Sequence, residues 1–257
     1  MEDAREAIAG GFVHLVKDET GSTNDDALAA LREGRKAPFW VTARMQKAGR
    51  GRHGRVWTSP PGNMYATLAL VEPCEQRHAA QFGYLIGLAL HDAIAEIAPA
   101  HAARVRLKWP NDVLVDGAKI AGMLLEGHHT RDGRFALIAG IGANIAFTPD
   151  DTPYPAARLA DLVADVTPQA LFDALARAFA RRFARWQEAS DATLALAVLR
   201  EDWLTRAYGL DGNVTIRLPG GPREGRFVGL DADGRLLLMS AGGIETIDAG
   251  DLYFAGM

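Results

Sequence analysis

The feature that most constrains the fold is a series of short apolar runs between residues 105 and 147, broken by tight-turn pairs. The runs are VRLKW, VLVDGAKIAGMLLEG and FALIAGIGANIAF, and the pairs are Asp116-Gly117 and Asp132-Gly133. An Asp-Gly pair between apolar runs is typical of a β-hairpin turn. The series therefore predicts adjacent antiparallel strands in one sheet, which needs helices to cover it.

Helical patterns flank the predicted sheet. Residues 79–98 carry apolar side chains at helical spacing, and Thr167-Pro168 is a cap followed by a first-turn proline. Nearer the N-terminus, Ser22 or Thr23 caps a helix that begins NDDALAAL. The fold class predicted from these patterns is α+β, a mixed and largely antiparallel sheet with helices packed on one side.

The C-terminal segment has a different pattern. Five short runs, NVTIRL, REGRFVGLD, GRLLLMS, GIETID and DLYF, are separated by Gly or Asp-Gly turns. Five strands in so short a stretch predict a small β-barrel. We therefore expect a main domain over residues 1–209 and the barrel over residues 210–257.

The sequence GRGRHG at residues 49–54 has the glycine spacing of a dinucleotide-binding turn. That interpretation requires a helix directly after the motif, but RVWTSPPGN places two prolines and a glycine there. The motif instead lies within an eleven-residue segment, residues 47–57, that holds three glycines and five basic side chains. We call residues 47–57 the flap and expect it to be mobile and positively charged.

Composition limits the classes of function. The net charge of −4 argues against a general nucleic-acid binder, because phosphate binding needs a broad basic surface. The single cysteine, Cys74, excludes a disulfide framework and fits a reducing compartment. The sequence shows neither a signal peptide nor an apolar run of membrane-spanning length. We therefore expect a soluble, cytoplasmic protein with no membrane partner.

A second polar cluster surrounds the first hairpin, in KWPNDVLVDGAKIAG at residues 108–122. Pro110 breaks the strand pairing, and counting outward from the turn places Lys108, Asp112 and Lys119 at one end of the sheet. Two cations beside a carboxylate suit anionic substrates. Joining a carboxylate to the α-phosphate of a nucleotide needs such cations, because the two anions repel. The mixed anhydride formed hydrolyses readily, so a closing flap would protect it.

Several of these motifs together resemble one family. In the same order along the chain, GSTN, Gln46 with GRGRHGRVW, KWPNDVLVDGAKIAGMLLEG, GIGANI and GLDADGRLLL resemble the biotin protein ligases, also called biotin–[acetyl-CoA-carboxylase] ligases. The resemblance covers nearly all of the chain. It implies a class II synthetase-like catalytic domain, an SH3-like C-terminal domain and a homodimer joined at a sheet edge.

The resemblance also implies a reaction in two steps. Biotin and ATP, with Mg²⁺, form biotinyl-adenylate, and a lysine of a biotin carboxyl carrier domain then accepts the biotin. Larger members of the family carry an N-terminal DNA-binding domain. Only twenty residues precede GSTN here, so we expect no DNA binding.

Site residues follow from matching the family's motifs to this sequence. Those expected to bind biotin are Ser22, Thr23, Asn24, Gln46, Arg50, Gly51, Arg52 and Lys119. Those expected to bind ATP are Arg50, Arg52, Trp57, Lys108, Asn111 and Asn144. Arg52 and Lys119 are expected to act as electrostatic catalysts, and Asn144 to hold Mg²⁺. Asp112 is expected to orient or deprotonate the incoming amine.

Some alternatives stay open at this level. A lipoyl or octanoyl transferase has a similar architecture, and a biotin-sensing protein could keep the pocket without transfer. Cys74 would suit the nucleophile of a transferase, but no histidine or lysine lies beside it in a recognisable motif. Trp57 either packs on adenine or anchors the core. His53, where some relatives have arginine, makes the flap's charge partly pH-dependent.

Overall fold

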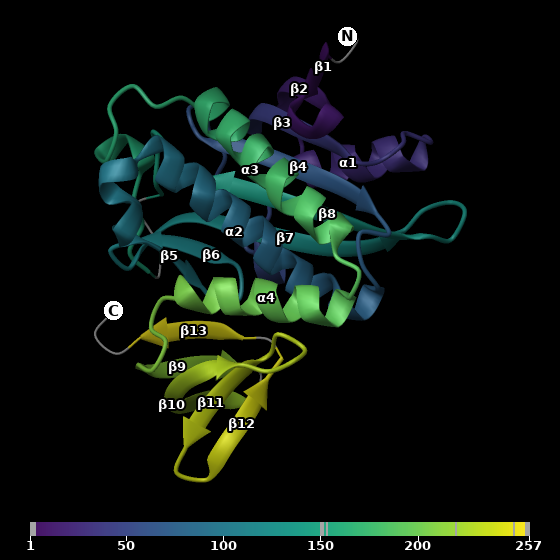
Figure 1. Ribbon diagram of the computed structural model, residues 1–257. Helices are drawn as coiled ribbons and strands as arrows, with labels where there is room; N and C mark the ends of the chain where they lie inside the picture. The colour runs from purple at the N-terminus through teal and green to yellow at the C-terminus, as the bar shows by residue number, and fades with distance from the viewer. Residues whose placement is uncertain (1–3, 150–151, 153, 219, 249, 255–257) are drawn as a thin grey trace.

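The chain folds into two β-sheets with helix α4, Ala192–Thr205, between them, as the computed structural model in Figure 1 shows. The structure describes residues 4–149, 152, 154–218, 220–248 and 250–254. The outer ends of the two predicted domains, residues 1–3 and 255–257, lie outside the described residues.

Eight strands form the larger sheet, in the order β1-β2-β3-β4-β8-β7-β6-β5. Strands β2 and β3 are parallel, and the other neighbouring strands are antiparallel. Their bounds are Ala4–Ile8 (β1), Phe12–Thr20 (β2), Phe39–Gln46 (β3), Met64–Val71 (β4), Val105–Lys108 (β5), Asp112–Val115 (β6), Ala118–His129 (β7) and Phe135–Ala143 (β8). The antiparallel strands predicted around the Asp-Gly turns are β5 to β8, and they are confirmed.

Two long helices cover one face of the larger sheet. Helix α2 spans Ala79–Ile97 and α3 spans Pro168–Glu188, and they pack on each other and on apolar side chains of the sheet such as Trp40. Helix α3 has the expected cap, because the hydroxyl of Thr167 accepts a hydrogen bond from the amide N–H of Ala170 at 3.1 Å. These helices and the sheet enclose the main hydrophobic core.

Helix α1, Thr23–Arg32, lies on the opposite face, which corrects the expectation that the helices pack on one side. Its Leu31 packs with Phe39 and Val41 of β3 in a second, smaller core. The reason lies in β3, where Phe39, Trp40 and Val41 are consecutive. Successive side chains of a strand point to opposite faces, so both faces of β3 are apolar and both need cover. The α+β class itself is confirmed.

The smaller sheet holds five antiparallel strands in the order β12-β11-β10-β9-β13, which confirms the five strands predicted for this region. Their bounds are Asn213–Leu218 (β9), Gly221–Leu230 (β10), Leu236–Ser240 (β11), Gly243–Ile247 (β12) and Asp251–Phe254 (β13). The hydroxyl of Tyr84 on α2 donates to the carbonyl of Gly234, which ties α2 to the turn between β10 and β11 of the smaller sheet. The domain boundary at residue 209 stays a prediction.

Short 3₁₀ segments complete the secondary structure, at Ala9–Gly11, Arg52–Gly54, Gln76–His78, Pro99–Arg104 and Leu159–Asp161. Within the part of the chain that the structure describes, no helix is long and apolar enough to cross a lipid bilayer. The start of α1, the flap after β3, the β5–β6 turn and β13 converge at one end of the larger sheet. These segments bound the pocket described next.

Candidate active site

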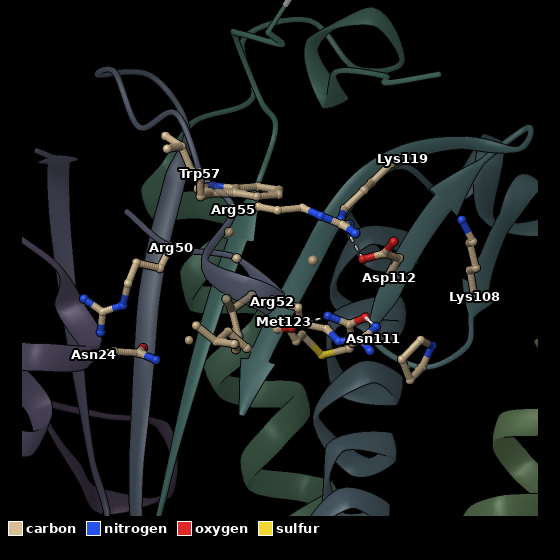
Figure 2. A pocket seen from close by; sticks show the side chains of 18 of the residues that line it. Asn24, Arg50, Arg52, Arg55, Trp57, Lys108, Asn111, Asp112, Lys119 and Met123 are labelled. Carbon is tan, nitrogen blue, oxygen red and sulfur yellow. Dashed lines mark hydrogen bonds and ion pairs between the residues drawn. The ribbon is translucent and has the colours of Figure 1, made fainter. Parts of the chain in front are cut away.

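A pocket lies over β7 and β8, and Figure 2 shows the side chains that surround it. Every predicted site residue except Asn144 lines this pocket: Ser22, Thr23, Asn24, Gln46, Arg50, Gly51, Arg52, Trp57, Lys108, Asn111, Asp112 and Lys119. The C-terminal sheet also contributes, through Leu252 and Tyr253 of β13. Segments separated by more than two hundred residues in the sequence therefore form one cavity.

Two glycines of β8 form part of the pocket floor. A Cβ atom at Gly140 would lie 2.4 Å from Oδ1 of Asn24, and one at Gly142 would lie 2.4 Å from Nε1 of Trp57. No side chain larger than hydrogen fits at either position without displacing its neighbour. The motif GIGA of β8 therefore allows Asn24 and Trp57 to lie directly on the sheet.

One end of the pocket is a network of uncharged side chains. Oε1 of Gln46 accepts hydrogen bonds from the amide N–H of Thr23 at 2.9 Å and from its hydroxyl at 3.1 Å, and Nε2 of Gln46 donates to Ser59 Oγ at 3.0 Å. Oγ1 of Thr67 lies 2.8 Å from Thr23 Oγ1 and 2.7 Å from Asn24 Oδ1. A hydroxyl has one proton and can donate to only one of these at a time. This end suits a neutral ligand that both donates and accepts hydrogen bonds.

Three side chains that hold Asn24 and Gln46 in place were not predicted, and one of them, Glu126, is acidic. Glu126 of β7 accepts a hydrogen bond from Asn24 Nδ2 at 2.6 Å, while Thr67 and Ser59 contact Asn24 and Gln46 as above. The sequence held a signal for Thr67, because it is the one small polar residue inside the apolar strand MYATLALV. In the structure it is fully buried, so its hydroxyl needs a partner. Glu126 ends the apolar run MLLEG and resembles an ordinary exposed strand end in the sequence.

The flap forms a short hairpin across the pocket. Backbone hydrogen bonds join Trp57 N–H to the carbonyl of Gly49 at 2.9 Å and Gly51 N–H to the carbonyl of Arg55 at 2.7 Å, with a 3₁₀ turn at residues 52–54. His53 in this turn has φ of 55°. The hairpin explains why the glycine motif does not open a helix, as the two prolines predicted.

The other end of the pocket is charged. Lys119 Nζ lies 2.7 Å from Asp112 Oδ1, and both side chains are largely buried. Lys119 pairs with Leu114 across β6 and β7, and Asp112 lies two positions away on the same face. The ammonium group also lies 5.3 Å from the ring of Trp57. The predicted placement of Lys119 beside Asp112 is confirmed.

Arg52 links the flap to the far wall of the pocket. Its Nη1 donates to Oδ1 of Asn111 at 3.2 Å and to the carbonyl of Gly250 at 3.2 Å. Lys108 lies on the same wall, with its Nζ 5.6 Å from the ring of Tyr253. Cations from the flap and from β5 and β7 therefore face the same end of the cavity, as expected for a site that holds phosphate.

Asn144 is the predicted residue that the structure does not bring to the pocket lining. It follows β8, is buried, and its Nδ2 donates to the main-chain carbonyl of Lys119 at 3.4 Å. The amide N–H of Asn144 donates to the carbonyl of Ile120 at 2.8 Å. These bonds tie it to the strand that carries Lys119, and its predicted role at Mg²⁺ stays a prediction.

A pocket with a neutral hydrogen-bonding end and a cationic end is typical of a ligase that activates a carboxylate with a nucleotide. Residues 18–144 match the Biotin/lipoate A/B protein ligase family, and residues 209–254 match the Biotin protein ligase C terminal domain. The chain is 40% identical to the biotin–[acetyl-CoA-carboxylase] ligase of Paracoccus denitrificans, over 92% of this chain and 98% of that one. The chain belongs to the biotin protein ligase family.

Solved structures agree with this assignment. The biotin protein ligase of Aquifex aeolicus in complex with biotin and ATP matches with a TM-score of 0.77 and 26% identity, over 93% of this chain and 97% of that one. The biotin protein ligase of Leishmania major in complex with biotinyl-5-AMP matches with a TM-score of 0.65 and 29% identity, over 92% and 98% of the two chains. The resemblance found in the sequence is thereby confirmed.

Proposed function

We propose that the protein joins biotin and ATP into biotinyl-5'-adenylate and pyrophosphate, and then transfers biotin to a lysine of a biotin carboxyl carrier domain. The observation that carries the proposal is that one pocket has an uncharged hydrogen-bonding end and a charged end. The neutral network of Thr23, Asn24 and Gln46 lies beside a charged cluster of Arg52, Lys119 and Asp112. Biotin has a neutral ureido head group and an anionic carboxylate tail, which match these two ends.

The neutral end binds the ureido ring of biotin. A ureido ring has one carbonyl acceptor and two N–H donors. The side chains of Ser22, Thr23, Asn24 and Gln46 supply the complementary hydroxyl and amide groups. Because the side chains of Thr23, Asn24 and Gln46 are held by one another and by Thr67, little conformational freedom is lost on binding.

The charged end carries the first chemical step. The biotin carboxylate attacks the α-phosphorus of ATP, an oxygen–phosphorus bond forms, and pyrophosphate leaves with its electron pair. Lys119 and Arg52 neutralise the charge that accumulates on the phosphoryl oxygens. Trp57 offers a ring surface for adenine, and Lys108 and Asn111 lie on the wall where the leaving pyrophosphate would pass.

Mg²⁺ enters with ATP in this proposal. Among the described residues there is no group of three His, Cys, Asp or Glu side chains that could cage a metal ion. Mg²⁺ needs few protein ligands when nucleotide phosphates and water supply the remaining oxygens, so this pocket is compatible with it. A bound ion would neutralise phosphate charge, and the amide oxygen of Asn144 is the proposed protein ligand, although this side chain lies behind the pocket lining, at the Lys119 carbonyl, and would have to turn toward the ion.

In the second step the ε-amine of the carrier lysine attacks the acyl carbon, an amide forms and AMP leaves. Asp112 accepts a hydrogen bond from this amine, orients it, and takes up its proton. Lys119 lies 2.7 Å from Asp112 and keeps that carboxylate beside the reaction centre.

The proposal also includes the carrier domain as partner, a cytoplasmic location and a homodimer joined at a sheet edge. DNA binding is not part of the proposal, because the net charge of −4 disfavours binding to a polyanion.

The test is transfer to a carrier domain. The protein is incubated with labelled biotin, ATP, Mg²⁺ and a biotin carboxyl carrier domain, and a carrier with its acceptor lysine changed to arginine is the control. Label on the intact carrier alone supports the proposal. Labelling by lipoate in place of biotin would assign the chain to the lipoyl transferases, and adenylate formation without transfer would make it a biotin sensor.

A further inference from the structure

Arg50 points away from the charged end of the pocket. Both of its terminal nitrogens donate to the carboxylate of Asp25, each at 2.7 Å, and Nη2 lies 3.9 Å from Oε1 of Glu126. Figure 2 shows its side chain directed to the side of Asn24, opposite to the side of Lys119 and Asp112. We propose that Arg50, Asp25 and Glu126 form a clasp that keeps the flap closed over the biotin end, and that Arg50 is a positioning residue.

The position of Arg50 in the flap lets one side chain hold the whole segment. Arg50 forms an isolated β-bridge with Val56, between the backbone hydrogen bonds that pair Gly49 with Trp57 and Gly51 with Arg55. Arg50 is therefore built into the paired part of the hairpin, outside the 3₁₀ turn. When its guanidinium is fixed to Asp25, the returning strand with Trp57 is fixed as well.

The anchor on the other side is rigid. Asp25 lies in the first turn of α1, where the partial positive charge of the helix N-terminus favours a carboxylate. The two hydrogen bonds from Arg50 lower the pKa of the Asp25 carboxyl, so it is ionised at neutral pH. The bidentate geometry fixes the orientation of the guanidinium as well as its distance.

Glu126 couples the clasp to the biotin end. One of its oxygens accepts from Asn24 Nδ2 at 2.6 Å, and the other faces Arg50 at 3.9 Å. Asn24 lies on Gly140 in the neutral network. The carboxylate of Glu126 therefore contacts a proposed biotin-binding side chain and the flap together, so a bound biotin head group and a closed flap stabilise the same arrangement.

Asp25→Asn tests the clasp, because it removes the charge and keeps the side-chain shape. Asp18→Asn is the matched control, since Asp18 forms an exposed bidentate pair with Arg44 on the same sheet and outside the pocket. The first measurement needs no ligand: trypsin cleavage after the flap arginines 50, 52 and 55. We expect cleavage about two- to five-fold faster in Asp25→Asn than in the wild type, and unchanged cleavage in Asp18→Asn.

The second measurement rests on the proposed function. Labelled biotinyl-adenylate is formed on the protein and its release without carrier is followed. We expect Asp25→Asn to release the adenylate about two- to five-fold faster than the wild type and to form it at an unchanged rate. At 1 M salt the difference in release rate between wild type and Asp25→Asn should narrow.

The two measurements test the clasp and the proposed function separately. Equal cleavage of wild type and Asp25→Asn, or equal acceleration in Asp18→Asn, overturns the clasp whatever the protein binds. Faster cleavage in a protein that forms no biotinyl-adenylate would retain the clasp and refute the proposed function. Thermal unfolding of each variant within about 2 °C of the wild type shows that the effect is local.

Discussion

The two floor glycines of β8 offer a way to perturb each half of the pocket separately. A methyl group at Gly140 would lie 2.4 Å from Asn24 Oδ1, and one at Gly142 would lie 2.4 to 2.8 Å from three atoms of the Trp57 indole. Ordinary contact needs roughly 3.5 Å, so each side chain must move by about 1 Å. Gly140→Ala displaces a side chain of the neutral end, and Gly142→Ala displaces the ring proposed to face adenine.

A displacement of about 1 Å in a reacting complex costs on the order of 100-fold. We therefore expect Gly142→Ala to lower kcat/KM for ATP about 100-fold and to change the Kd of biotin less than about three-fold. Gly140→Ala should show the reverse pattern, with biotin affinity about 10- to 100-fold weaker. Biotin binding is measured by calorimetry without nucleotide, and ATP use by release of pyrophosphate at saturating biotin.

Gly220→Ala is the matched control. A methyl group there meets no atom within 4 Å, and its turn lies between β9 and β10. It should bind biotin and use ATP as the wild type does. If Gly140→Ala and Gly142→Ala weaken both ligands equally, or if neither has an effect while each variant stays folded, the division of the pocket into a biotin end and a nucleotide end is wrong.

Three further predictions concern single side chains. Asp112→Asn should slow transfer to the carrier about 10- to 100-fold while single-turnover adenylate formation is spared, and an equal loss in both steps would exclude its role at the amine. Burial raises the pKa of the Cys74 thiol to about 11, so alkylation by iodoacetamide should be slow at pH 8 and accelerate toward pH 11. We expect Cys74→Ser to transfer biotin as the wild type does, and loss of transfer would favour the alternative in which Cys74 is a nucleophile. Burial alone would raise the pKa of Asp92, but its contacts with His91 and Arg182 lower it to about 2. Its stabilising effect is therefore complete above the usual value of about 4 and is lost as the pH falls toward 2, so Asp92→Asn should reduce the free energy of unfolding by about 2 kcal/mol at pH 7 and by much less at pH 2 in urea titrations.

The sequence predicts best those features that depend on neighbouring residues. The Asp116-Gly117 turn fixes the register of β6 and β7, so the approach of Lys119 to Asp112 follows from counting along the hairpin. Thr167-Pro168 likewise starts α3 where expected. In each case the residues that form the turn or cap are neighbours in the sequence.

Contacts between distant segments could not be predicted in this way. The bond of Arg52 to the carbonyl of Gly250 joins residues 198 positions apart, and the bond of Asn24 to Glu126 spans 102 positions. The sequence around each of these residues does not indicate which distant residue it contacts. The position of α1 was missed for a related reason, because only the paired sheet shows that β3 is apolar on both faces.

The flap illustrates the same limit. Its composition predicts a charged glycine-rich segment, yet the sequence does not show that the two arginines of GRGRHG, Arg50 and Arg52, have different partners. Arg50 pairs with Asp25 of α1, whereas Arg52 reaches Asn111 and the C-terminal sheet. Residues of one type in one motif therefore have separate roles, which only the three-dimensional arrangement reveals.

The exchange of labelled pyrophosphate into ATP in the presence of biotin measures the first chemical step directly. We expect rapid exchange by the wild type and by Lys36→Gln, since Lys36 is exposed and lies outside the pocket, and a loss on the order of 100- to 1,000-fold in Lys119→Gln. Exchange by Lys119→Gln at the wild-type rate would contradict the claim that the charged end of this pocket joins biotin to the nucleotide.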